Sequence, residues 1–485
     1  MENKILIYNS LSRKKEEFIP LNHPRVNIYT CGVTVYDDSH IGHARSLYIF
    51  DVIRRYLEYR RFDVKFVRNI TDVDDKIINR ANELKVGWQE LVKKYIGRYY
   101  EDLEALGIKK GDFEPRATEN IADMVKYIQT LVDKGYAYEA GGDVYFNVRK
   151  FPDYGKLSGQ SIDQMETGVR IGPSELKHDP LDFALWKKSK EGEPFWDSPW
   201  GQGRPGWHIE CSVMSQKFLK TDTLDIHAGG RDLIFPHHEN EIAQAEALTG
   251  KQFAKYWIHH GLLTINGQKM SKSLGNFVTI KDALKKYHLD VLKLFYLQAH
   301  YSSPIDFSEK KMTEEKQRYI SFVRLNDIYK EYRLMNLNNA LSLKDAGIVK
   351  EYEHKFESAM DDDFSTPQAL AALEQLKSYA YSLHADDIVK NWSKFEYSVD
   401  TINRLLRDIF GMNPDIADLM VDLRFRNIID ESLKDTKIID EMVEERSKLK
   451  KDQRFAEADK IRKDLEVKGI ILEDRKDGKT IWRWS

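Results

Sequence analysis

The amino-acid sequence predicts an α/β fold: a parallel-sheet domain split by an insertion, followed by a helical bundle and a small C-terminal domain. The first observation is a strand–helix–strand pattern. Strand-like runs occupy residues 26–32 and 62–70, and between them apolar residues from Leu47 to Leu57 recur at the spacing of a helix face. The second is a stretch at 111–204, rich in turn residues and tryptophan, that interrupts this pattern. The third is helical periodicity almost throughout after Glu309.

Length and composition are those of a multidomain globular protein. The chain has 485 residues, of which 41% are hydrophobic and 32% charged, so it can build a sizeable core. No run approaches the roughly eighteen apolar residues that would span a bilayer, and the first residues contain no signal-peptide core. We therefore expect a cytoplasmic enzyme without a membrane partner. The net charge of −3 means that any RNA contact must come from a local patch.

The strand at 26–32 turns into the following helix through His40-Ile41-Gly42-His43. At such a turn, free backbone N–H groups and the positive helix end favour anionic ligands. Two imidazoles there could donate to a phosphate. Histidines near a helix start are more often solvated or capping residues, and the tetrad alone leaves both interpretations open.

The second strand ends in an acidic cluster that begins at Thr71. A structural interpretation makes Thr71 or Asp72 the N-cap of the next helix. A functional interpretation places Thr71 beside a substrate, because it lies at the carboxyl end of a strand. Helical periodicity then predicts a helix from Lys76 to about Leu106.

The chain has two cysteines, Cys31 and Cys211, and a structural disulfide between them is not expected in a reducing compartment. They could be small buried hydrophobic residues. Alternatively, Cys211 lies within about thirty residues of His237 and Glu241, which are four apart and share a helix face. If the segment at 205–241 joins the same sheet as the first strand, the four side chains form an acceptable Zn²⁺ ligand set.

A second basic motif, Lys269-Met270-Ser271-Lys272-Ser273, follows Gly267. Two lysines on a mobile loop can reach phosphate oxygens and neutralise developing charge. The alternative is an exposed basic loop without a ligand. Near the C-terminus, the charged helix at 441–468 carries both signs and favours a solvated face, whereas the Trp- and Arg-bearing end at 480–484 could stack on unpaired bases.

The tetrad at 40–43 and the Lys-Met-Ser-Lys-Ser motif at 269–273, in this order around a split α/β domain, resemble the paired signature of class I aminoacyl-tRNA synthetases. Residues 30–36, 203–212 and 235–241, with Ala456–Arg462 near the end, resemble the cysteinyl-tRNA synthetase family in particular. The resemblance runs nearly the whole length of the chain, and no motif position departs from it.

The resemblance implies a ligase that uses ATP to convert L-cysteine to cysteinyl-adenylate and then charges the 3′-terminal adenosine of tRNA(Cys). It implies one Zn²⁺ per chain that binds the substrate thiolate and so separates cysteine from serine, Mg²⁺ with ATP, and a monomer. The implied Zn²⁺ ligands are Cys31, Cys211, His237 and Glu241. The implied ATP-binding residues are His40, Gly42, His43, Lys269 and Lys272, of which the two histidines and the two lysines are also catalytic. The implied cysteine contacts are Gly32, Thr71, Trp207, His227 and Asp232.

The same resemblance gives each part of the chain an expected role. The Rossmann-like catalytic domain comprises 1–110 and 205–260, with the inserted domain at 111–204. The junction with the lysine loop follows at 261–308. We expect a tRNA-binding helical bundle at 309–425 and a small anticodon-binding domain at 426–485.

Three alternatives remain at this point. A related cysteine ligase transfers cysteine to an amino sugar, but it would need no anticodon-reading tail, and residues 426–485 keep one. A catalytically silent RNA-binding protein would be expected to have lost some of the histidines, lysines or metal ligands, and all are present. A second activity that forms cysteine persulfide is neither supported nor excluded by the sequence.

Overall fold

The computed structural model describes residues 4–162, 177–270, 275–335, 343–414, 439–467, 470–474 and 480–484. The chain divides into two compact units. The first comprises residues 1–319, 350–375 and 401–413, and the second comprises residues 320–349, 376–400 and 414–485. No described helix combines the length and the apolar character that crossing a bilayer requires.

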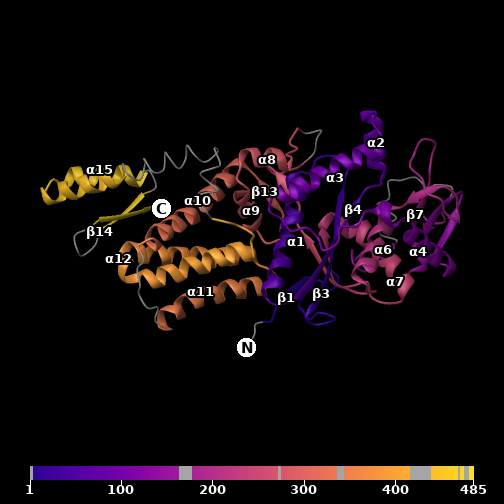
Figure 1. Ribbon diagram of the computed structural model, residues 1–485, viewed down its shortest axis with the longest axis horizontal. Coiled ribbons are helices and arrows are strands. Elements are labelled where there is room, and N and C mark those ends of the chain that lie inside the picture. The colour runs from indigo at the N-terminus through magenta and orange to yellow at the C-terminus, as the bar shows by residue number, and fades with distance from the viewer. Residues whose placement is uncertain are drawn as a thin grey trace. The chain divides into compact units, whose positions relative to one another are not determined.

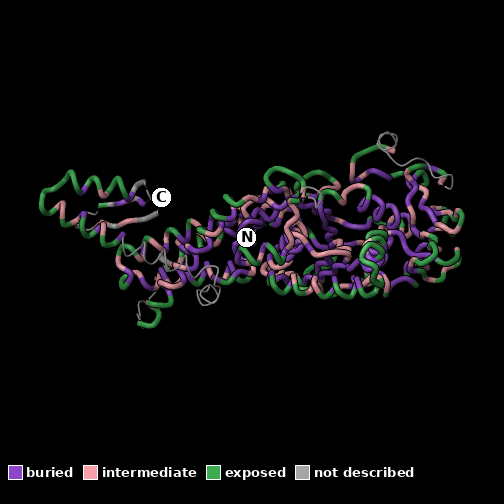
Figure 2. Tube along the Cα trace, turned by 90° about the horizontal axis from the view of Figure 1, so that it is seen from above, coloured by how far each residue is buried: buried purple, intermediate pink, exposed green. Residues whose placement is uncertain are grey.

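A four-stranded parallel sheet in the order β10-β9-β3-β4 forms the centre of the first unit. Helix α1 lies on one side of β3 and β4, and α6 and α7 lie on the other (Figure 1). Most residues of β9 and β10 and many of β3 and β4 are buried. Figure 2 colours the chain by how far each residue is buried. The predicted α/β class is confirmed. The bounds of these elements are β3 (Arg25–Thr34), α1 (Ile41–Tyr59), β4 (Asp63–Thr71), α6 (Trp207–Leu219), β9 (Leu224–Gly230), α7 (Glu239–Thr249) and β10 (Ala254–His260).

Between β4 and α6 the strand pairing changes from parallel to antiparallel, as an inserted segment would produce. Strands β5 to β8 pair in sequence order, and α4 precedes them. Before them, Phe113 and Arg116 pair with Val67 and Ile70 of β4, so this segment first runs along the edge of the main sheet. The bounds are α4 (Ile121–Asp133), β5 (Ala137–Ala140), β6 (Asp143–Phe146), β7 (Phe183–Lys188) and β8 (Gly203–Pro205).

Two smaller sheets flank the main one in the sequence. An N-terminal hairpin pairs β1 (Leu6–Asn9) with β2 (Lys14–Glu17). After β10, strand β11 (Leu263–Ile265) pairs with both β12 (Gln268–Lys269) and β13 (Ile305–Phe307). Helices α8 (Ile280–Lys286) and α9 (Leu289–Leu297) lie between β12 and β13 in the chain. Long helices follow: α10 (Glu309–Arg333), α11 (Leu343–Asp361) and α12 (Thr366–Asp408).

The end of the chain forms a small hydrophobic cluster within the second unit. Helix α15 (Phe455–Val467) precedes an antiparallel pair, β14 (Ile470–Asp474) and β15 (Thr480–Trp484). Ile439, Val443, Leu465, Ile470 and Leu472 are buried together. Arg446, also buried, donates to both carboxylate oxygens of Asp474 at 2.8 and 3.0 Å.

Two local expectations were wrong. The single helix expected over 76–106 is two helices, α2 (Asp75–Leu84) and α3 (Trp88–Ala105), because Lys85 adopts a left-handed conformation that ends the first. The N-cap of α2 is Asp74, whose side chain accepts from the Lys76 amide, and neither Thr71 nor Asp72 caps it. Thr71 instead stays in β4, and its neighbour Asp72 binds Thr118.

A buried arginine joins the first turns of α1 to the segment after β10. The guanidinium of Arg45 donates to the backbone carbonyls of Gly261, Leu262, Tyr301 and Ser303 at distances from 2.6 to 3.2 Å. Buried carbonyls need such partners. Arg45 therefore holds the start of the lysine-loop region against the helix that begins at His40.

The carboxyl group of Asp102, on α3, has a pKa well above the usual value for aspartate. Burial, together with the negative charges of Asp38 and Glu101, raises the pKa of Asp102 to about 7, while Arg98 and Lys281 act in the opposite direction. An unfolded aspartate titrates near pH 3.9. The folded protein therefore holds this proton more tightly than the unfolded chain, and stability present below about pH 4 is lost as the pH rises through about 7.

Asp102→Asn should consequently stabilise the protein at pH 8 and have much less effect at pH 5. The amide removes the repulsion from Asp38 and Glu101, and we expect about 1 kcal/mol after allowance for solvent screening. Thermal unfolding of both proteins at the two pH values measures the difference. An equal shift in melting temperature at pH 5 and pH 8 would contradict a raised pKa.

Candidate functional site

The four residues grouped above as candidate metal ligands converge at the carboxyl end of the main sheet. Cys31 lies in β3 where its register with β4 shifts, and Cys211 lies in the first turns of α6. His237 precedes α7 and Glu241 lies in its first turn. One donor atom from each lies within 4.8 Å of all the others. The strands β3 and β9 pair in parallel, so the expectation that both segments share one sheet is confirmed.

The spacing within this group fits a tetrahedral ion. With Zn–S near 2.3 Å and Zn–N near 2.0 Å, ligand atoms lie about 3.3–3.8 Å apart. The two sulfurs are 3.8 Å apart, Cys211 Sγ is 3.6 Å from His237 Nε2, and Cys31 Sγ is 3.5 Å from Glu241 Oε1. The His237–Glu241 contact is shorter, 2.9 Å, which is a hydrogen-bond distance. Two thiols, an imidazole and a carboxylate are also the donor types that Zn²⁺ takes.

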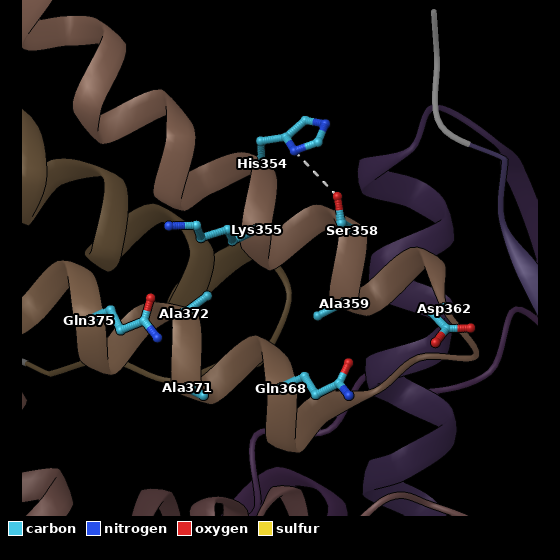
Figure 3. Close-up of a pocket in the computed structure, with 9 residues that line it drawn as sticks. All are labelled: His354, Lys355, Ser358, Ala359, Asp362, Gln368, Ala371, Ala372 and Gln375. Atoms are coloured by element: carbon cyan, nitrogen blue, oxygen red, sulfur yellow. Dashed lines mark hydrogen bonds between the residues drawn. The ribbon is translucent and has the colours of Figure 1, made fainter.

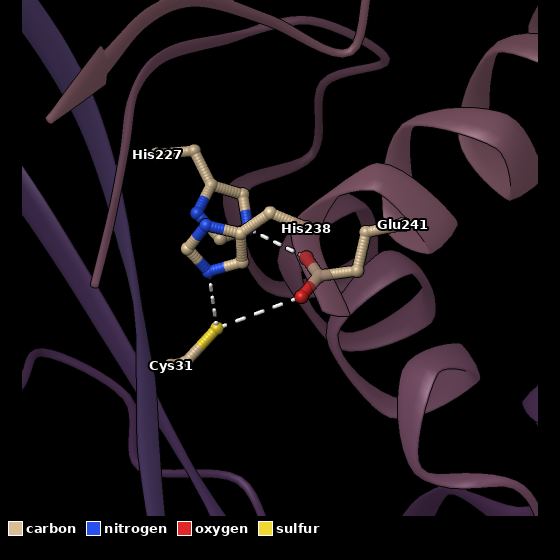
Figure 4. Close-up of side chains that lie close together, drawn as sticks. All are labelled: Cys31, His227, His238 and Glu241. Atoms are coloured by element: carbon tan, nitrogen blue, oxygen red, sulfur yellow. Dashed lines mark hydrogen bonds and ion pairs between the residues drawn. The ribbon is translucent and has the colours of Figure 1, made fainter. Parts of the chain in front are cut away.

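A second group, Cys31, His227, His238 and Glu241, is equally compact (Figure 4). Its distances are those of hydrogen bonds: 2.6 Å from His227 Nε2 to Glu241 Oε2 and 3.2 Å from His238 Nε2 to Cys31 Sγ. These two histidines therefore surround the first group, each bonded to one of its members. His227 Nδ1 is buried and has no hydrogen-bond partner within the described residues.

Buried charge accumulates in this cluster. Burial opposes ionisation of Glu241, but His227 and His237 outweigh it and hold the pKa of the carboxyl well below its usual range. Burial also disfavours the charged form of His237, and Glu241 with Cys211 nevertheless raises its pKa to about 9. A fully buried carboxylate that must be balanced by positive charge suits a cation site.

Aromatic and imidazole rings pack around His237. The Trp207 ring stacks on it with centroids 3.8 Å apart and planes 19° apart. His208 Nδ1 lies 2.8 Å from His237 Nδ1, so one ring donates to the other and the orientation of His237 is fixed. Trp207 is thus beside the cluster, as the sequence-based substrate role requires.

The predicted substrate residues on β3 and β4 form one hydrogen-bonded layer. Asn69 Oδ1 accepts from the Gly32 amide at 2.8 Å, and Asn69 Nδ2 donates to Thr71 Oγ1 at 3.3 Å. The Thr71 hydroxyl donates to the buried Glu210 at 2.6 Å. A Cβ at Gly32 would overlap the Asn69 carbonyl, so this close approach requires glycine. Asp232 lies in the short turn Arg231–Leu233 after β9.

The two histidines of the tetrad cap the helix that they begin. His40 is the N-cap of α1, and its Nδ1 accepts from the amides of Gly42 and His43 at 3.1 and 3.2 Å. In return, the His40 amide donates to His43 Nδ1 at 3.3 Å. This reciprocal pair is a capping box built from imidazoles. The rings stack with centroids 3.7 Å apart.

The capping bonds decide the tautomer of both rings. Because each Nδ1 accepts a hydrogen bond, a neutral ring must carry its proton on Nε2. Desolvation of the half-buried His43 ring, with His40 and Lys76 nearby, lowers its pKa to about 3. A neutral ring in this turn therefore has its N–H at Nε2, next to the positive end of α1, and both kinds of group favour phosphate oxygens.

The segment that follows the lysine motif lies beside this turn. The Ile41 amide donates to Val278 O at 3.1 Å, and the Ile280 amide donates to Ser39 O at 2.9 Å, so the segment after the motif pairs with the tetrad. Lys269 is exposed in β12. Lys272 lies outside the described residues. The fold thus brings residues 278–280, a few positions after the motif, into backbone contact with the tetrad region more than 220 positions earlier in the sequence.

Sequence reasoning missed His238 as a hydrogen-bond partner of Cys31, and it assigned nothing to His208. The adjacent pair His237-His238 was the available signal, since both rings of a histidine pair can face one buried site. A hollow of about 370 Å³ lies elsewhere, between α11 and α12 (Figure 3). None of the described site residues lines it.

Comparisons with known proteins agree on one family. Residues 17–317 match the catalytic domain of tRNA synthetases class I (C), and residues 355–412 match the DALR domain. The chain is 49% identical to a cysteine–tRNA ligase from Aquifex aeolicus, with 98% of each chain covered. It is 48% identical to a cysteine–tRNA ligase from Persephonella marina, with 98% of this chain and 99% of the relative covered.

Solved structures share the fold at much lower identity. A methionyl-tRNA synthetase from Mycobacterium tuberculosis in complex with methionyl-adenylate has a TM-score of 0.62 at 16% identity, with 80% of this chain and 92% of the other covered. A putative arginyl tRNA synthetase from Campylobacter jejuni has a TM-score of 0.56 at 12% identity, with coverage of 80% and 93%. These neighbours agree with the predicted sheet and helical C-terminal region.

Proposed function

Because the chain belongs to the cysteine–tRNA ligase family, we propose that it joins L-cysteine to tRNA(Cys) in two steps, through cysteinyl-adenylate. The observation that carries the proposal is the tetrahedral spacing of Cys31, Cys211, His237 and Glu241 at the carboxyl end of the sheet. Their donor types and their distances both suit Zn²⁺. We assign the cytoplasm as its location and a monomer as its working state.

These four side chains would hold Zn²⁺, which when bound coordinates the thiol of the substrate and lowers its pKa so that it binds as the thiolate. The serine hydroxyl is a poorer ligand and stays protonated, whereas an apolar pocket alone would separate the two amino acids only weakly. The protein contributes orientation. Trp207 and His208 fix the His237 ring, and His227 fixes the Glu241 carboxylate.

The remaining cysteine contacts follow from the neighbouring layer. Gly32 lets the β3 backbone approach Asn69 closely at the edge of the substrate site, and Thr71 and Asp232 supply polar groups near the strand ends. His227 Nε2 is bonded to Glu241, and its buried Nδ1 has no partner in the described chain. That buried polar atom supports its role as a substrate contact, because a polar group of the substrate would satisfy it.

In the first step, a carboxylate oxygen of cysteine attacks the α-phosphorus of ATP, and the bond to the bridging oxygen breaks to release pyrophosphate. His40 and His43 donate Nε2–H to phosphate oxygens as negative charge redistributes. Gly42 allows close approach of ATP at the turn. Lys269 and Lys272 hold the leaving pyrophosphate, and Mg²⁺ accompanies the nucleotide. Because the protein forms no covalent bond with the substrates, it accelerates the reaction by positioning them and by stabilising the developing charge.

In the second step, a ribose hydroxyl of the tRNA's terminal adenosine attacks the cysteinyl carbonyl, and AMP leaves. We assign tRNA binding to the helices at 309–425 and anticodon reading to residues 426–485. Single-stranded anticodon bases are recognised by stacking and by polar contacts to their edges. The DALR match at 355–412 supports this assignment of the helical part.

Cysteine-dependent ATP–pyrophosphate exchange, with serine as competitor, tests the proposal on zinc-loaded protein. We expect exchange with cysteine and almost none with serine, followed by formation of cysteinyl-tRNA(Cys) when the tRNA is added. Exchange without tRNA charging would favour transfer to another acceptor. Absence of exchange by a folded, zinc-loaded protein would contradict the adenylation step itself.

A further inference from the structure

A chain of hydrogen bonds connects the N-terminal hairpin to Cys31. Ser10 Oγ lies 2.8 Å from His259 Nδ1. His259 Nε2 lies 2.8 Å from His238 Nδ1, and His238 Nε2 lies 3.2 Å from Cys31 Sγ. The two histidines are buried and the two end residues are half-buried. None of the roles argued above uses Ser10 or His259.

The hydrogen bonds that link Ser10 to Cys31 can all donate in one direction, from Ser10 towards Cys31. A metal-bound cysteine is a thiolate and can only accept, so His238 must donate from Nε2. A neutral His238 then accepts at Nδ1 from the Nε2–H of His259. His259 in turn accepts at Nδ1 from the Ser10 hydroxyl. Each ring therefore has one donor and one acceptor in use. The thiolate at one end determines both tautomers, and the Ser10 hydroxyl at the other end supplies the donor that His259 Nδ1 then needs.

The hairpin that carries Ser10 is firmly attached on two sides. The Ser10 amide donates to Trp257 O at 2.9 Å, and the Trp257 amide donates to Asn9 Oδ1 at 3.0 Å, which joins the hairpin to β10. On the other side, the Tyr8 amide donates to Asp363 Oδ1 at 2.8 Å. The hairpin therefore provides a fixed point for the Ser10 hydroxyl.

Cys31 needs such support more than the other members of its group. It lies where the pairing of β3 with β4 slips between Thr30 and Val33. At an irregularity of this kind the strand bends and the side chain is re-aimed, so the sheet ladder alone does not orient it. Cys211, by contrast, lies within helix α6 and is buried.

We propose that Ser10, His259 and His238 are positioning residues that hold the Cys31 sulfur in the metal-binding geometry and adjust its electron donation to the ion. This inference rests on the proposed function, because it requires Cys31 to be a metal ligand. It gives the hairpin at residues 6–17, which precedes nearly all of the matched catalytic domain, a part in the active site. Such outer partners commonly change metal affinity about 10- to 100-fold.

Cobalt(II) binding to the full-length protein tests the proposal without measuring activity. The readouts are the dissociation constant and the sulfur-to-cobalt charge-transfer band. We expect His238→Ala to weaken binding about 10- to 100-fold and to shift the band. His238→Gln should restore much of both, because its amide can donate from the position of Nε2. Ser10→Ala should shift the band in the same direction by a smaller amount.

Ser12→Ala is the matched control. Its hydroxyl belongs to the same turn but lies 3.5 Å from Asn9 O, and it takes no part in the hydrogen bonds that link Ser10 to Cys31. If Ser10→Ala behaves like Ser12→Ala, the Ser10 hydroxyl does not position Cys31, and the part of the proposal that involves the hairpin is overturned. Equal loss in His238→Ala and His238→Gln would overturn it by showing that only ring packing matters. Failure of the unaltered protein to bind cobalt would overturn the metal centre and this inference together, so the two failures are distinguishable.

Discussion

Replacing Cys211 with serine should remove the bound metal and reduce cysteine-dependent ATP–pyrophosphate exchange by roughly a thousandfold or more, which corresponds to about 4 kcal/mol. The reason is the change of donor. A serine hydroxyl stays protonated at neutral pH and is a weak Zn²⁺ ligand, and the remaining three groups would keep a tetrahedral ion poorly. Metal content by elemental analysis and the exchange rate with cysteine measure the two losses.

Ser215→Ala is the control for this variant. Ser215 is buried on the same helix, and its hydroxyl donates to the backbone carbonyl of Ser212, which is not one of the four candidate ligands. It should keep both metal and exchange. If Cys211→Ser lost its metal but kept exchange and rejection of serine, thiolate recognition would be refuted while adenylation on this fold would stand.

His40→Asn should separate the structural and catalytic roles of the tetrad. Asparagine is among the best N-cap residues, so the start of α1 should keep its cap and the unfolding free energy should change by less than about 0.5 kcal/mol. The substitution removes the Nε2–H donor, however, and the exchange rate should fall about 10²- to 10³-fold. Denaturant unfolding and exchange kinetics on the same preparation measure both effects.

His40→Ala is the comparison for this experiment, because alanine supplies neither the cap nor the donor. We expect the same loss of exchange together with about 1 kcal/mol of destabilisation. An active His40→Asn protein would show that the imidazole serves the helix and not the phosphates, which is the capping interpretation that the sequence left open.

Much of the candidate site was predictable because its residues carry their chemistry in their type and spacing. Cys211, His237 and Glu241 fall within about thirty residues, and the four-residue step from His237 to Glu241 defines a helix face. Cys31 could be added only on the assumption of a shared sheet, which the parallel pairing of β3 and β9 confirms. The family was also predictable, since the two motifs and their surroundings are specific.

Other features depend on contacts that no sequence pattern encodes. The break between α2 and α3 depends on a left-handed Lys85, which apolar periodicity does not reveal. The sequence offered capping as one interpretation of the tetrad, and the geometry shows that both imidazoles do cap α1, each through its Nδ1. The chain from Ser10 to Cys31 joins four segments by single hydrogen bonds and leaves no periodic signal.

The sequence by itself determined the fold class, the family and the chemical identity of the candidate ligands, because periodicity and residue type are local properties of the chain. Only the tertiary structure decided the distances at which the imidazoles lie from the two cysteines and Glu241. His237 and His238 are adjacent in sequence and both buried, and they differ only in the distances and bond directions that packing imposes. Those distances arise from long-range contacts among β3, α6, α7 and the N-terminal hairpin, which form only when the chain has folded.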